Sequence, residues 1–85
     1  MAALRAQFGE RLRLLRRQAD LSQEELAECA DLSLDFISLV ERGINAPSFE
    51  SLEKLAAALS VQVMELFRFD AAIEVDETVP RESVD

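Results

Sequence analysis

The sequence contains no histidine, tyrosine or tryptophan, and only one cysteine, two glycines and two prolines among 85 residues. A single cysteine excludes a disulfide framework and a cluster of thiolate metal ligands. There is no glycine-rich phosphate loop, and the plentiful carboxylates fall at ordinary helical spacing on solvent faces. We therefore expect no enzyme activity, no cofactor and no metal site.

Long apolar runs are also missing, because the longest is far too short to span a bilayer. No secretory signal pattern opens the chain, so we expect a cytoplasmic protein without membrane contact. Apolar residues make up 49% of the chain, which with so little glycine and proline favours one all-helical domain with a modest core. Cys29 falls on the inner face of an expected helix, and we interpret it as a small core residue rather than a redox thiol.

Positive charge is scarce, since nine basic residues face seventeen acidic ones and the net charge is −8. Nucleic-acid-binding domains usually carry a basic surface, so this balance counts against non-specific DNA binding. Residues 70–85 hold six acidic residues against Arg81, which leaves eleven acidic and eight basic residues in 1–69. A local positive face is still compatible with these numbers, because the first expected helix carries Arg5, Arg11, Arg13, Arg16 and Arg17.

The stretch 21–43, LSQEELAECADLSLDFISLVERG, has the pattern of two short helices joined by a tight turn. Ser22 precedes the first apolar-periodic run and Glu25 follows three residues later, which is the spacing of a capping box. Ser33 can cap the second helix, and Gly43 ends it with a residue that adopts left-handed backbone easily. The inward positions of the two helices are Leu26, Ala27, Ala30, Ile37 and Val40.

Two helices joined this closely must cross steeply, and small residues such as Ala27 let them approach each other. The result is a helix-turn-helix arrangement, whose second helix can lie in the major groove of DNA. The turns before and within it contain Asp20 and Asp31, and aspartate is among the few residues that tolerate left-handed backbone.

Further helices are predicted on both sides of this pair. Residues 3–18 form a first helix with Gly9 inside it, a position that suggests close packing, and with an apolar stripe of Leu4, Phe8, Leu12 and Leu15. A fourth helix follows Ser48 and turns Leu52, Leu55, Ala56 and Leu59 inward. A fifth helix is expected near 63–69, where the apolar residues Met64, Leu66, Phe67 and Phe69 exceed what one small core needs.

Several segments, in this order and spacing, resemble the Cro/C1 (XRE-type) repressor domain over roughly residues 5–69. They are SQEELA at 22–27, ISLVERG at 37–43, PS at 47–48, LEKLAAAL at 52–59 and LF at 66–67. Small controller proteins of restriction-modification systems are similar in length and in this pattern. The resemblance implies an all-α, five-helix, lambda-repressor-like DNA-binding domain over 1–69. Residues 70–85 are acidic, contain Pro80 and show no helical stripe, so we expect an extended or disordered tail, with contact to a second protomer as one interpretation.

The resemblance also implies which residues meet DNA. Gln23 matches the family's phosphate-contacting glutamine at the start of the first motif helix. The exposed or half-exposed positions of the recognition helix and the loop behind it are Ser33, Leu34, Asp35, Phe36, Ser38, Leu39, Arg42 and Asn45. Arg16 and Glu41 match an arginine and a glutamate that bridge the first helix to the recognition helix, with a positional role.

Two departures from the family leave an alternative open. Leu34 and Asp35 stand where the family usually has glutamine, arginine, lysine or threonine, and the loop 44–46 lacks the usual lysine or arginine. Such a face donates few hydrogen bonds to base edges. The alternative function is an antitoxin or protein-interaction module with the same fold and weak or no DNA binding.

The expected function is a sequence-specific transcriptional regulator, a repressor or controller, that binds a pseudo-palindromic operator of double-stranded DNA as a homodimer. The family commonly dimerises through its last helix, which here assigns Met64, Phe67 and Phe69 to the dimer interface. The alternative for the two phenylalanines is that they close the bottom of the core. RNA polymerase is a further candidate partner, because a bound regulator either blocks or recruits it.

Overall fold

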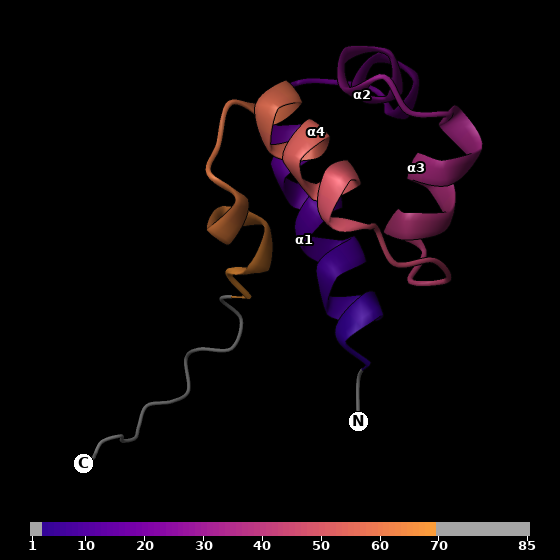
Figure 1. Ribbon diagram of the computed structural model, residues 1–85, viewed down its shortest axis with the longest axis vertical. Helices are drawn as coiled ribbons and strands as arrows, with labels where there is room; N and C mark the ends of the chain where they lie inside the picture. The colour runs from indigo at the N-terminus through magenta and orange to yellow at the C-terminus, as the bar shows by residue number, and fades with distance from the viewer. Residues whose placement is uncertain (1–2, 70–85) are drawn as a thin grey trace.

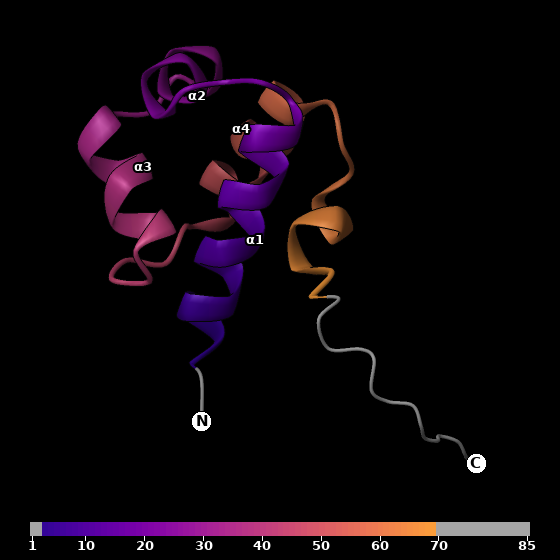
Figure 2. The same ribbon diagram turned by 180° about the vertical axis from the view of Figure 1, so that it is seen from behind.

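The long first helix runs through the middle of the molecule, and the other elements pack around it. The computed structural model describes residues 3–69, in which α1 (Leu4–Gln18), α2 (Gln23–Ala30), α3 (Leu34–Glu41) and α4 (Phe49–Leu59) precede a 3-10 helix, η1 (Val63–Phe67). Helix α3 lies on one side of α1 and η1 on the other (Figure 1), and α4 packs against α2 and η1. Seen from behind, α2 closes the end of the molecule above α3 and α4 (Figure 2).

One apolar core joins all five elements. The predicted inward residues of α2, α3 and α4 are buried, and Leu12, Leu26, Ile37, Leu55 and Leu66 are completely shielded from solvent. The stripe predicted on α1 is correct for Phe8, Leu12 and Leu15. Leu4 departs from it, with 59% of its surface exposed, because it begins the helix beyond the edge of the core.

Serine side chains set the starts of three helices, as the sequence predicts. Ser22 and Glu25 form a capping box in which Ser22 Oγ accepts from the Glu25 amide at 3.0 Å and Glu25 Oε1 accepts from the Ser22 amide at 2.8 Å. Ser33 and Ser48 cap α3 and α4 through the backbone amides three residues on. These bonds satisfy amides that have no partner inside the helix.

Left-handed residues reverse the chain after each of the four α-helices of the described residues. Asp20 and Asp31 have φ angles of 62° and 58°, so both expected turns form, and Ser60 after α4 has a φ of 59°. Gly43 follows α3 with a φ of 78°. The turn after α2 is therefore short enough to bring α3 across it.

Close contact between α1 and α3 depends on Gly9. A Cβ atom at this position would lie 2.5 Å from the carbonyl oxygen of Val40 and 2.6 Å from that of Glu41, so no larger residue fits without moving α3. Glycine inside a helix costs about 1 kcal/mol relative to alanine, and here the close approach explains its presence. The suggestion of tight packing at Gly9 is confirmed.

Two further sequence expectations are wrong. The fifth helix is not an α-helix to residue 69 but the 3-10 helix η1, held by bonds such as Glu65 N–H to the Gln62 carbonyl at 2.9 Å. A segment this short cannot offset the cost of nucleating an α-helix, and a 3-10 turn is the usual outcome. Cys29 is exposed rather than in the core, because α2 buries only a narrow stripe of Leu26, Ala27 and Ala30.

The tail expected over 70–85 lies outside the described residues, and its predicted conformation stays a prediction. Among the helices that the structure describes, none combines the length and apolar character needed to cross a membrane.

Candidate nucleic-acid interface

Helix α3 presents one face to solvent while its other face is anchored in the core. Ile37 and Val40 are completely buried, which fixes the rotation of the helix about its axis. On the opposite face Leu34 is 44% exposed, and Asp35 is also exposed. A protruding face of this kind, on the second helix of the motif, can enter a major groove.

The remaining residues expected to contact DNA, on α3 and directly beside it, differ in their exposure to solvent. Ser33 and Arg42 are exposed at the two ends of the helix, and Ser33 Oγ also accepts the capping bond from the Phe36 amide at 3.0 Å. Ser38, Leu39 and Asn45 are half-buried.

Phe36 differs from the others, because its half-buried ring packs against the core. Contact with thymine methyl groups, suggested for this residue by the sequence, is therefore restricted to the part of the ring that remains exposed.

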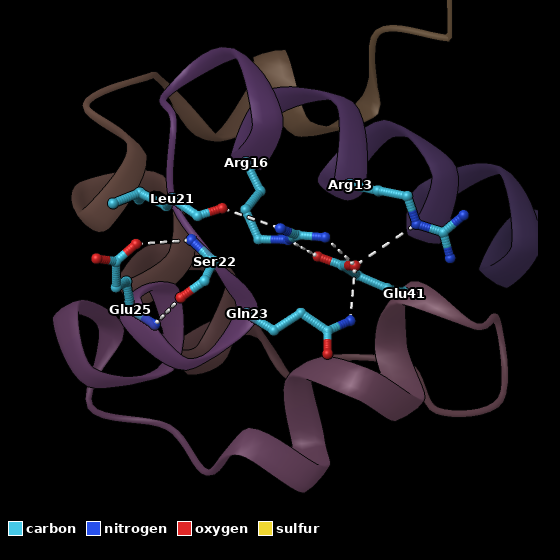
Figure 3. Close-up of polar contacts among 7 residues, drawn as sticks. All are labelled: Arg13, Arg16, Leu21, Ser22, Gln23, Glu25 and Glu41. Atoms are coloured by element: carbon cyan, nitrogen blue, oxygen red, sulfur yellow. Dashed lines mark hydrogen bonds and ion pairs between the residues drawn. The ribbon is translucent and has the colours of Figure 1, made fainter.

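Glu41 is the centre of a polar network that joins α1, α2 and α3. Its carboxylate accepts from Arg16 through two bonds, Nε to Oε2 at 2.6 Å and a terminal nitrogen to Oε1 at 3.0 Å (Figure 3). Gln23 donates from its amide nitrogen to the same Oε1 at 3.0 Å, and Arg13 Nε lies 3.6 Å from that atom. Arg16 also donates to the Leu21 carbonyl at 2.9 Å, which ties the loop before α2 to α1.

Electrostatics keeps Glu41 ionised although it is buried, with 3% of its surface exposed. Burial raises the pKa of the Glu41 carboxyl, but the hydrogen bonds from Arg16 and Gln23 and the charges of Arg16 and Arg13 outweigh it, so the pKa lies below its ordinary value. The hydrogen bond to Glu41 raises the pKa of Arg16, against the opposing effect of burial. The network is therefore a fixed ion pair at neutral pH.

The Gln23 side chain is held by the Glu41 network and is not simply solvated at the start of α2. It is half-buried and is oriented by Glu41. The sequence did not indicate this contact, nor the approach of Arg13, because both depend on how α2 and α1 meet α3. The only available signal was the position of Arg13, one helical turn before Arg16 on α1.

A second surface is apolar and lies on α4 and η1. Met64 is 68% exposed and Phe67 39%, whereas Phe69 is half-buried and packs against the core. Phe67 is linked to Phe8 of the core, with ring centroids 5.2 Å apart, and to Phe69 at 6.2 Å. Phe67 therefore belongs both to the closure of the core and to the surface.

The sequence interpretation missed two residues of this surface, Phe49 and Val63, and Phe49 is the most exposed large hydrophobic side chain within residues 3–69, at 86%. Phe49 is the first residue of α4, directly after the Ser48 cap. An aromatic residue at the exposed start of a helix is a sequence signal for a binding surface, and it could have been used here. A shallow hollow of about 310 Å³ lies beside it, lined by Phe49, Leu52, Glu53, Val63 and Phe67.

Comparisons with known proteins give a consistent picture. Residues 7–68 match the model of the helix-turn-helix domain family. The control protein C.BamHI of Bacillus amyloliquefaciens is 39% identical over 67 residues, which are 78% of this chain and 83% of that protein. The immunity repressor protein of Bacillus phage phi105 is 36% identical over 74 residues, or 87% of this chain, but this chain spans only 46% of its length.

A solved structure agrees with these relatives. The restriction-modification controller protein C.AhdI from Aeromonas hydrophila superimposes with a TM-score of 0.73 at 43% sequence identity. The match covers 74% of this chain and 96% of that one.

Proposed function

We propose, from the premise that this chain belongs to the helix-turn-helix domain family, that it regulates transcription by binding an operator as a homodimer. The chain is a DNA-binding transcriptional regulator, and the match to control and repressor proteins supports a repressor or controller role. Blocking or recruiting RNA polymerase in the cytoplasm would be the consequence of operator binding.

The observation that carries this proposal is the orientation of α3. The Glu41 network holds the end of α3 against α1 and α2, and buried Ile37 and Val40 hold its middle. Its outer face, with Leu34, Asp35 and Arg42, consequently points away from the domain. A rigidly aimed, unburied face is what groove reading requires.

The exposed and half-buried polar side chains on and beside α3, and Leu34, then have defined roles. Arg42 donates to a phosphate or, through two parallel bonds, to guanine, and Ser33 and Ser38 donate to phosphates or base edges. Asp35 accepts from a cytosine amino group, and Leu34 contacts a thymine methyl. Because few of these contacts are basic, we expect modest affinity and a shallow dependence on salt.

Two protomers bind through the apolar surface of α4 and η1, formed by Phe49, Val63, Met64 and Phe67. Exposed aromatic and methionine side chains around a shallow hollow suit a partner with the same surface, as two-fold symmetry demands. A symmetric dimer would place its two recognition helices in half-sites about one helical turn, roughly 34–36 Å, apart.

The test is a gel-shift and footprinting experiment on the DNA upstream of the protein's own gene. We expect protection of an inverted repeat, lost in the double variant Arg42→Ala with Gln23→Ala. Lys54→Ala is the control, because Lys54 lies on α4 beside Asp31 and Glu50 at the opposite end of α2 from Gln23.

Two outcomes contradict the proposal. Operator affinity that survives both substitutions would show that α3 and the start of α2 do not dock on DNA as described. No protection, together with tight binding to a protein encoded next to this gene, would favour an interaction module that uses the apolar and acidic face of Leu34 and Asp35.

A further inference from the structure

Four basic side chains in residues 3–69 have no carboxylate of their own, namely Arg5, Arg13, Arg17 and Arg42, and Arg13 is the one that lies beside Glu41. Arg11 and Arg68 share Glu65, and Lys54 lies between Asp31 and Glu50. Arg13 approaches only Glu41, whose charge already balances that of Arg16 at shorter distances. The cluster of Arg13, Arg16 and Glu41 therefore carries one positive charge in excess.

The geometry of Arg13 leaves its donors available. Only Nε faces Glu41, at 3.6 Å, and the two terminal nitrogens point away from the carboxylate (Figure 3). Within residues 3–69, no hydrogen bond engages the Arg13 guanidinium, and 39% of its side chain is exposed. Two parallel N–H groups on an accessible guanidinium form the fork that matches a phosphate.

Gln23 is held next to this fork by the same carboxylate oxygen. A carboxylate only accepts hydrogen bonds, so the Gln23 amide must turn its nitrogen toward Glu41 Oε1. The nitrogen keeps a second N–H that this bond does not use. Gln23 and Arg13 approach one oxygen atom, at 3.0 and 3.6 Å, so the two side chains are neighbours around Glu41.

We infer that Arg13 and Gln23 together bind one phosphate of the DNA backbone, with Glu41 as the positioning residue that both side chains share. Arg13 supplies the charge and two donors from α1, and Gln23 supplies a further donor from the start of α2. Because the two side chains come from different helices, the phosphate would fix how the whole domain sits on the duplex. Such a contact carries no sequence information.

This inference rests on the proposed DNA binding and extends it to a specific residue of α1. The variants that test it are Arg13→Gln, Gln23→Ala, their combination, and Arg13→Lys. Lys54→Gln is the charge-matched control, because it removes one positive charge far from Gln23. Each variant is titrated against the footprinted operator duplex and against an unrelated duplex of equal length, over a range of salt concentrations. Thermal melting checks that each variant is folded.

We expect Arg13→Gln to weaken binding by about tenfold for each bound protomer and by the same factor on both duplexes. The slope of log K against log salt should fall by about 0.9 for each phosphate contact that is lost. Arg13→Lys should keep the slope but bind less tightly, since an ammonium cannot donate in parallel. The double variant should lose less affinity than the product of the two single losses, because the two residues share one phosphate.

Three results overturn the inference while leaving the proposed function intact: an unchanged slope in Arg13→Gln, an equal fall in slope in Lys54→Gln, or independent losses in the double variant. If the unmodified protein binds neither duplex, the proposed function fails and the inference fails with it. The two failures are thus distinguished by the behaviour of the unmodified protein.

Discussion

Arg16 and Glu41 face each other across the contact between α1 and α3 and share two hydrogen bonds, of 2.6 and 3.0 Å. Both side chains are largely shielded, with 11% and 0% of their surfaces exposed. A planar guanidinium that donates to one carboxylate from two of its three nitrogens allows little rotation, so the pair fixes the angle between the two helices.

Removing one partner should be costly because it leaves the other charge buried. We expect Glu41→Ala to lower the free energy of unfolding by about 3–5 kcal/mol, measured by urea denaturation. The double variant Arg16→Met with Glu41→Leu should recover most of this loss, since an apolar pair leaves no buried charge without a partner. A melting temperature unchanged by Glu41→Ala would contradict a structural role for the pair.

Stability should depend on pH through the same carboxylate. The pKa of Glu41 is lower in the folded protein than in the unfolded chain, so its contribution is complete above the unfolded pKa of about 4.3 and is lost as pH falls through the folded value. The difference in unfolding free energy between the wild type and Glu41→Gln should therefore be largest at neutral pH and shrink below about pH 4. A difference that grows on acidification would mean that the folded pKa is raised.

Alanine at Gly9 should destabilise the domain, although alanine is the better helix former. Its Cβ would meet two backbone carbonyls of α3 at 2.5 and 2.6 Å. The cost of overpacking, about 1–3 kcal/mol, should exceed the gain of about 1 kcal/mol in helix propensity. Glu10→Gly, at the exposed neighbouring position, calibrates the propensity effect in the same helix. A rise in the melting temperature of Gly9→Ala would show that α3 moves away easily.

Charge on the apolar surface of α4 and η1 should separate the proposed dimer. We expect Met64→Glu and Phe49→Glu to weaken self-association by about tenfold or more, measured by sedimentation, because both side chains are exposed on this surface. Leu14→Glu is the matched control, since Leu14 is 45% exposed on α1. Equal self-association in all three variants would place the interface elsewhere.

The helices were predictable from the sequence because their signals are local. Serine caps, the spacing of buried residues and the two aspartates in turns each act within a few residues, and the structure has them where they were expected. Cys29 was misjudged because the buried stripe of α2 is narrower than its apolar composition suggests.

The site was less predictable, because its contacts join distant parts of the chain. The resemblance to a known family supplied the pairing of Arg16 with Glu41. The positions of Gln23 and Arg13 around Glu41 depend on the crossing of three helices, which no spacing in the sequence specifies.

Asp20, Asp31 and Ser60 occupy left-handed backbone without being glycine. Such a conformation costs an ordinary L-residue about 1–2 kcal/mol, and somewhat less for aspartate. The free energy of unfolding is therefore lower than it would be with residues that adopt this backbone without strain. Substituting glycine at these three positions should raise the melting temperature without changing the core, the exposed face of α3 or the apolar surface of α4 and η1.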